Sequence, residues 1–174
     1  ENDPDEWVRT VTTNLLGTYH TARVCLPLLQ KTDDGRVLLF SGGGAFSPEP
    51  GFSAYAATKG ATVALMETLA EELSNTSTTV NCIAPGFIAT GIHTGTPHEH
   101  RQAAPDAMAN VVGCVRHLLS PQTQGLTGRT ISAAWDDWRN LTPWTIPHLD
   151  RMGQRDRHLI AGLQRLLMRG QRAI

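Results

Sequence analysis

The chain has 174 residues, of which 40% are hydrophobic and 18% are charged, a composition typical of a globular protein with a single domain-sized core. The formal net charge of -1 favours neither nucleic acid nor an anionic surface as a partner. No apolar run approaches the roughly 18 residues of a membrane span, no signal peptide opens the chain, and the three cysteines lie far apart. We therefore expect a cytoplasmic protein with reduced thiols and no membrane partner.

A first helix is expected to begin at Asp3-Pro4, because aspartate caps helices well and proline suits the first helical position. Apolar residues then recur at near-helical spacing as far as Leu26, and Pro27 marks the expected end. Asn14 lies inside this helix, where asparagine is a poor helix former. It is either a surface residue or a functional one.

A buried strand is predicted at 36–41, where Arg36-Val37-Leu38-Leu39-Phe40-Ser41 is almost continuously apolar. Such runs suit a parallel strand covered on both faces. Gly42-Gly43-Gly44 follow the strand and suggest a phosphate-binding loop. We reject that interpretation, because no helix begins directly after the glycines and no Gly-Lys-Ser/Thr is present.

The next helix is expected from Ser53 to Leu73, and it places Tyr55 and Lys59 one turn apart on the same face. A phenol has an ordinary pKa of about 10, and a nearby ammonium lowers it. A tyrosine tuned in this way can pass a proton to or from a substrate oxygen. Taken alone, however, a Y-x-x-x-K pair more often represents a half-packed tyrosine beside a solvated lysine.

Two further strands, at 78–84 and 127–133, flank a helix that starts at Pro105-Asp106. Helices that alternate with strands imply right-handed crossovers and a parallel sheet. In the tail, 156–172 form an amphipathic stretch rich in arginine that is expected to dock on this fold or on a partner chain, with membrane-surface binding as the alternative.

Three histidines in the polar loop after the second of these strands raise the question of a metal site; they are His93, His98 and His100. The surrounding threonine, glycine and proline residues offer no rigid scaffold for coordination. No metal is expected.

Several motifs, taken in order, resemble the C-terminal part of a short-chain dehydrogenase/reductase (SDR). They are Asn14-Leu15-Leu16-Gly17, Gly35-Arg36-Val37 into Ser41, Ser53-Ala54-Tyr55-Ala56-Ala57-Thr58-Lys59-Gly60-Ala61, Leu69-Ala70-Glu71-Glu72-Leu73, Val80-Asn81-Cys82-Ile83-Ala84-Pro85-Gly86, Thr90 and Leu126-Thr127-Gly128-Arg129. The resemblance implies an α/β fold over 1–134. This would be a partial Rossmann-like, doubly wound parallel sheet that keeps the last three strands and their flanking helices, with a separate helical tail at 135–174.

By this resemblance, Tyr55 would be the catalytic acid/base, and Lys59 would hold the nicotinamide ribose and lower the pKa of the phenol. Asn14 would hold a water behind Lys59 in a proton relay. The resemblance implies NAD or NADP as cofactor, and it assigns the following residues to the nicotinamide half: Pro85, Gly86, Ile88 and Thr90. The loop from Gly91 to Ala104 would be a substrate lid.

The family also places a serine on the substrate oxygen, and here the motifs disagree about its position. Counting forward from Asn14 leads to Ser41, which we take as the catalytic serine. Counting back from Tyr55 leads to Gly42, which has no side chain. Ser47 and Ser53 are the remaining alternatives.

The glycine fingerprint T-G-x-x-x-G-x-G and the N-N-A-G motif of the family do not occur in these residues. They would supply the pyrophosphate turn and the choice between NAD and NADP. The strand at 36–41 should then present an open edge, which is a liability unless it is covered.

Two functions follow from these observations. The first is the catalytic half of an NAD(P)-dependent oxidoreductase that acts on a small carbonyl or alcohol. The second is a non-catalytic remnant that serves as a binding or assembly module. In both cases the resemblance implies a homo-oligomer formed through the helices at 5–30 and 55–74.

Overall fold

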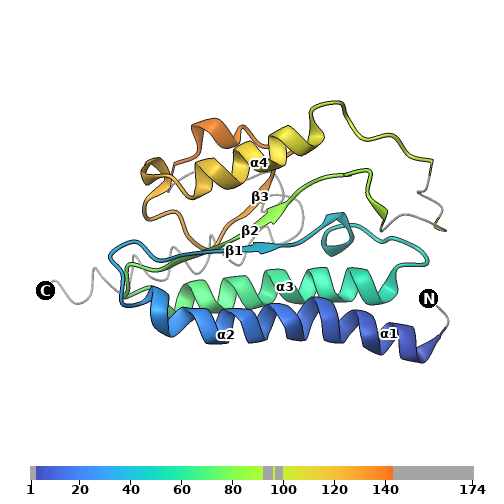
Figure 1. The fold of residues 1–174 in the computed structure, drawn as a ribbon, viewed down its shortest axis with the longest axis horizontal. Coiled ribbons are helices and arrows are strands. Elements are labelled where there is room, and N and C mark those ends of the chain that lie inside the picture. Colours follow the sequence, from blue (N-terminus) through green and yellow to red (C-terminus); the bar gives the residue numbers. More distant parts are fainter. Residues whose placement is uncertain (1–2, 92–95, 97–99, 143–174) are drawn as a thin grey trace, which may run out of the picture.

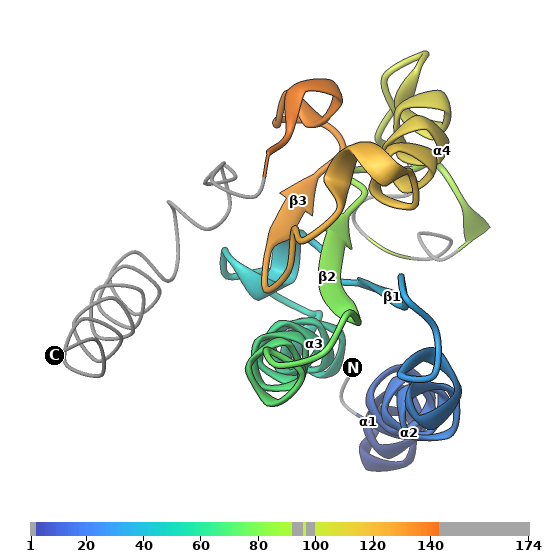
Figure 2. The same ribbon diagram turned by 90° about the vertical axis from the view of Figure 1, so that its left-hand side faces the viewer.

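The computed structural model describes residues 3–91, 96 and 100–142. Its three parallel strands form one sheet in the order β1-β2-β3, with β1 at Arg36–Phe40, β2 at Thr79–Ala84 and β3 at Thr130–Ser132. The α-helices are α1 (Pro4–Val11), α2 (Gly17–Leu29), α3 (Ser53–Glu72) and α4 (Ala107–Leu118). Helices α1, α2 and α3 lie on one side of the sheet and α4 lies on the other (Figures 1 and 2). This arrangement confirms the predicted α/β fold.

The first helical segment is continuous but not uniform. Asp3 caps it by accepting a hydrogen bond from the amide of Asp5 at 2.9 Å. Between α1 and α2 the chain forms a π-helical turn at Thr12–Leu16, and α2 then continues past Pro27 to Leu29. Within the described part of the chain, no helix is long and apolar enough to cross a membrane.

Strand β2 is buried along its whole length and separates two apolar clusters. Val80 and Cys82 belong to the cluster under α3, which also contains the fully buried Met66. Ile83 faces the opposite way and joins the cluster under α4. A strand that packs on both faces in this way is typical of a doubly wound sheet.

The packed core extends beyond β3. Trp138 lies in the short 3-10 helix Trp138–Asn140, and both Trp138 and Leu141 are buried in the cluster under α4. The proposed division between 1–134 and 135–174 stays a prediction. The amphipathic stretch expected at 156–172 lies outside the described residues.

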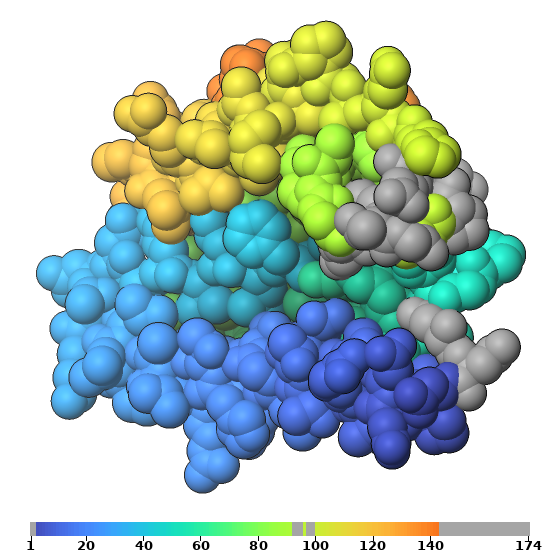
Figure 3. Space-filling view, turned by 45° about the vertical axis from the view of Figure 1, so that its right-hand side comes forward, coloured from blue at the N-terminus to red at the C-terminus, as the bar shows by residue number. Residues whose placement is uncertain are grey.

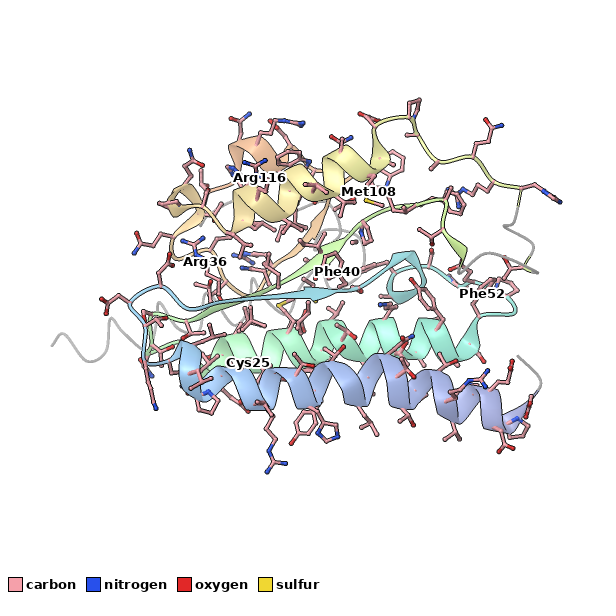
Figure 4. All side chains as sticks on the ribbon, viewed as in Figure 1. Cys25, Arg36, Phe40, Phe52, Met108 and Arg116 are labelled. Carbon is pink, nitrogen blue, oxygen red and sulfur yellow. The ribbon has the colours of Figure 1, made fainter. Side chains whose placement is uncertain are left out.

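Among the described strands, β1 is hydrogen-bonded on one side only, so it forms the edge of the sheet, as predicted. Figure 3 shows this edge at the molecular surface, between the segment of α1 and α2 and that of α4. Arg36 ties the start of β1 to the end of α4, because its guanidinium donates to the carbonyl of Leu118 at 2.9 Å and to Thr123 Oγ1 at 2.8 Å. At the other end of β1, Phe40 is 46% exposed (Figure 4).

Candidate functional site

The residues singled out by the sequence gather where β1 and β2 end. Ser41 and Gly42 directly follow β1, and Pro85 and Gly86 directly follow β2. Helix α3 begins close to this end of the sheet and carries Tyr55 in its first turn (Figure 1). In open parallel sheets, ligands bind at the carboxyl ends of the strands, so this is the expected place for a site.

The tip of the Tyr55 side chain lies against the end of β1. A Cβ atom built on Gly42 would stand 2.7 Å from the phenol oxygen of Tyr55 and 3.4 Å from its Cζ. The phenol oxygen therefore occupies the space that a side chain at residue 42 would need. Tyr55 itself is half-buried.

Lys59 follows one turn later and is fixed to the same strand. Its Nζ donates a hydrogen bond to the carbonyl of Phe40 at 3.0 Å and lies 5.4 Å from the centre of the Tyr55 ring. Burial lowers the pKa of Lys59, and the nearby Cys82 side chain raises it by a smaller amount. The structure thus brings the two predicted side chains together.

Ser41 has a different environment from the one expected of a catalytic serine. Its side chain is buried, and its hydroxyl donates to the backbone carbonyl of Lys59 at 3.1 Å. The hydroxyl is engaged with α3, whereas the next residue, Gly42, contacts the phenol. Of the two positions that the sequence left open, the geometry places Gly42 and not Ser41 at the phenol.

The two remaining serines are also engaged elsewhere. Ser47 donates to the carbonyl of Gly43 at 3.4 Å, and the Ser53 hydroxyl accepts a hydrogen bond from the indole of Trp7 at 3.3 Å. The second of these contacts links α1 to the start of α3.

Asn14 lies in the π-helical turn and reaches the site through one intermediate residue. Its side-chain amide donates to Thr58 Oγ1 at 3.4 Å, and the buried Thr58 hydroxyl donates to the backbone carbonyl of Tyr55 at 2.7 Å. π-helical turns inside α-helices frequently occur at functional sites. The turn here faces the part of α3 that carries Tyr55 and Lys59.

The electrostatic balance at Tyr55 differs from the sequence-based expectation. The resemblance implied a pKa lowered by Lys59, but the pKa of Tyr55 is raised, first by burial of the phenol and second by the negative charge of Glu49. The ammonium of Lys59 is hydrogen-bonded to the end of β1 and not to the phenol oxygen. Near neutral pH the phenol is therefore protonated and suited to act as an acid.

Glu49 was not singled out by the sequence. It lies in the loop between β1 and α3, where its backbone carbonyl accepts a hydrogen bond from the amide of Phe52 at 3.1 Å. Its Oε2 lies 3.4 Å from the position of a Cβ built on Gly44. The sequence feature that could have drawn attention to it is that Glu49 is the one acidic residue between Ser41 and Tyr55.

Substituting Glu49 by glutamine is expected to lower the pKa of Tyr55, because one of the two causes that raise it is removed. The pKa should stay above its ordinary value, since burial is the larger cause. Ultraviolet absorbance of the phenolate during a pH titration measures this change, and a Tyr55→Phe variant subtracts the contribution of Tyr19, the other tyrosine. Glu72→Gln, at the far end of α3, should leave the titration unchanged. A Glu49→Gln titration that coincides with the wild type would contradict the assignment.

Comparison with known protein families identifies the family of this chain. The family model described as short chain dehydrogenase matches residues 1–101. The chain belongs to the short-chain dehydrogenase family.

Relatives and solved structures agree with this assignment. Over 138 residues the chain is 39% identical to the Homo sapiens protein named Dehydrogenase/reductase SDR family member 4, a match that covers 72% of this chain and 49% of the relative. It resembles a 3-oxoacyl-[acyl-carrier protein] reductase with bound NAD from Brucella melitensis (TM-score 0.64, 30% identity, 82% of this chain and 53% of that chain). It also resembles a short chain dehydrogenase complexed with NADPH from Escherichia coli CFT073 (TM-score 0.68, 28% identity, 77% and 55%). The chain therefore spans about half the length of these relatives.

The segment expected to lie along the nicotinamide leaves the sheet beside β3. Gly86 has a φ of 79°, a conformation that favours glycine, and a Cβ on it would stand 3.0 Å from the Cβ of Ala134. Ile88 packs against the cluster under α4, and Thr90 is exposed. The assignment of these residues to the nicotinamide half of a cofactor stays a prediction.

The expected lid at 91–104 is described in part. At its end, the Arg101 guanidinium lies 4.6 Å from the centre of the Phe87 ring, so this part of the loop returns to the end of β2. His93 and His98 lie outside the described residues, and among those that are described no group of three side chains could hold a metal ion.

Proposed function

We propose that the chain carries the proton-handling and nicotinamide-side half of an NAD(P)-dependent oxidoreductase that interconverts a carbonyl and an alcohol. The observation that carries this proposal is the pairing of Tyr55 and Lys59 at the carboxyl end of β1. Solved relatives with bound NAD and with NADPH support a nicotinamide cofactor of either kind.

In this proposal the chain manages one proton, and the nicotinamide, when bound, supplies the hydride chemistry. Tyr55 donates its phenolic proton to the substrate oxygen in reduction and accepts it back in oxidation. Its raised pKa keeps the proton on the phenol near neutral pH and so favours the reductive direction. The test is oxidation of NADH or NADPH by the complete protein in the presence of a carbonyl compound.

Lys59 and the segment after β2 are the residues in this chain that fit a nicotinamide ribose. The Lys59 ammonium has three donors, and one of them is engaged by the carbonyl of Phe40. The two remaining N–H donors of the ammonium are of a kind that can hydrogen-bond to ribose hydroxyls. We propose Pro85, Gly86, Ile88 and Thr90 as the wall along the nicotinamide, and Asn14 as the holder of a relay water behind Lys59.

Asn14 is linked to α3 through the Thr58 hydroxyl, which supports that placement. The backbone carbonyl of Asn14 also accepts a hydrogen bond from the Thr18 hydroxyl at 2.6 Å. The first contact ties the π-helical turn to α3, and the second stays within the helical segment and links the turn to the start of α2.

The chain on its own is expected to bind NADH weakly or not at all, because no glycine fingerprint for the pyrophosphate occurs in its 174 residues. Titrating NADH into this polypeptide and following the enhancement of nicotinamide fluorescence gives the affinity. We expect no saturation at submicromolar concentrations. Submicromolar binding would show that the nicotinamide half suffices and would refute the need for a further nucleotide-binding segment.

An assembly role is a second candidate, and one observation favours it. Large apolar side chains are exposed along the helical segment from α1 to α2, namely Trp7, Val8, Leu16, Tyr19, Val24 and Leu28. A helical segment with several exposed large apolar side chains is a candidate interaction surface. We propose that the helices at 5–30 and 55–74 form a homo-oligomer, whether or not the protein turns over, and that the protein acts in the cytoplasm.

A further inference from the structure

At the end of β1, the residue that contacts the phenol of Tyr55 is Gly42, which has no side chain. Gly42 is buried, and the phenol oxygen sits where its Cβ would be, at 2.7 Å. The contact is with the tip of a half-buried side chain, so a larger residue at 42 would displace the phenol by a small movement of the ring. Residue 42 is therefore a position from which a side chain would meet the phenol oxygen of Tyr55.

The neighbouring hydroxyl does not replace the one that Gly42 lacks. Ser41 directs its hydroxyl to the carbonyl of Lys59, and successive residues of an extended segment point to opposite sides. Glu49, the other polar group that acts on the phenol, is a carboxylate when ionised and so accepts hydrogen bonds without donating them.

A substrate carbonyl oxygen has two lone pairs and develops negative charge as it is reduced. A second donor aimed at such an oxygen commonly changes the rate by about 10²–10³-fold. We propose that, because residue 42 is a glycine, Tyr55 is the one side chain among the described residues that donates to the substrate oxygen, and that the site therefore selects carbonyls activated by a neighbouring electron-withdrawing group, such as α-diketones, over simple ketones. This inference rests on the proposed function. An activated carbonyl needs less polarisation by hydrogen-bond donors, so the absence of one donor lowers its rate of reduction less than that of a simple ketone.

The first experiment tests whether residue 42 faces the phenol of Tyr55, and it does not require an active enzyme. Phenolate absorbance is titrated in the wild type, Gly42→Ser, Gly42→Ala and Ser41→Ala proteins, with Tyr55→Phe as the baseline. A hydroxyl at residue 42 can donate to the phenolate and should lower the pKa of Tyr55 in Gly42→Ser relative to Gly42→Ala. A lowered pKa only in Gly42→Ser supports the placement, whereas a change on losing the Ser41 hydroxyl, with none in Gly42→Ser, overturns it.

The second experiment measures substrate preference in the complete protein. Values of kcat/KM are compared for diacetyl and butanone, which differ by the activating carbonyl. The wild type should prefer diacetyl, and Gly42→Ser should raise kcat/KM for butanone by about 10²-fold, with a smaller gain for diacetyl. Gly42→Ala adds the same Cβ without the hydroxyl and should give no such gain.

Equal use of the two ketones by the wild type, or the same gain in Gly42→Ala as in Gly42→Ser, overturns the selectivity. A wild-type protein that reduces neither ketone contradicts the proposed function. In that case the phenolate titration still decides which residue faces Tyr55, so the two failures are distinguishable.

Discussion

Replacing Tyr55 by phenylalanine is expected to lower kcat of the complete protein by about 10²–10⁴-fold, the usual contribution of a positioned acid or base. The substitution removes one oxygen atom and keeps the ring that packs beside Gly42 and Lys59. The fold and the affinity for the cofactor should therefore change little. Steady-state kinetics at saturating cofactor and carbonyl concentrations measure the loss.

Tyr19→Phe is the matched control, because it removes the same atom from the other tyrosine of the chain. Tyr19 lies on α2, is 41% exposed and has its ring beside that of His20. Its kcat should equal that of the wild type. Unchanged turnover in Tyr55→Phe would refute the acid/base role, and a parallel loss in both variants would indicate a structural effect instead.

The raised pKa of Tyr55 explains why the acid form is the one to test first. A phenol that is half-buried and close to Glu49 loses its proton less readily than one in water. Reduction uses the protonated form, so its rate should hold through neutral pH and fall on the alkaline side. Oxidation, which needs the phenolate, should show the opposite trend.

Features that depend on local sequence were predicted well. The apolar run from Arg36 gave β1, and the helix that carries Tyr55 and Lys59 begins at Ser53, the residue expected to cap it. Phe52 is the residue that precedes the helix, a shift of one position that is ordinary for helix boundaries.

Features that neither apolar spacing nor a local motif encodes were missed. Apolar spacing does not distinguish a π-helical turn from the α-helix around it, so the turn at Asn14 became visible only in the structure. Ser41 and Gly42 are adjacent in sequence, and only the packing of α3 on β1 shows that they have different contacts. The effect of Glu49 depends on the path of a proline- and glycine-rich loop, which no periodicity encodes.

The segment after β3 shows the same limit, because Trp135 and Trp138 have opposite environments. Trp135 is 74% exposed, whereas Trp138 is 6% exposed and lies in the core cluster under α4. Its ring packs on α4 at Gly113, where a Cβ would stand 2.6 Å from Cη2, and its centre lies 6.1 Å from that of the His117 ring. A helix surface without a side chain at this point is what allows the indole to approach the backbone.

Trp138→Ala is therefore expected to lower the free energy of unfolding by about 3–5 kcal/mol, since it removes a large buried ring and leaves a cavity. The substitution also removes the cation–π contact of the Arg139 guanidinium, which lies 3.9 Å from the centre of the ring. Trp135→Ala is the matched control and should change the free energy by no more than about 0.5 kcal/mol, because exposed positions tolerate truncation. Urea denaturation followed by far-ultraviolet circular dichroism compares the two variants with the wild type. Equal losses in both variants would contradict the docking of Trp138 on α4, whereas a loss confined to Trp138→Ala would show that the segment after β3 is part of the domain that holds the site.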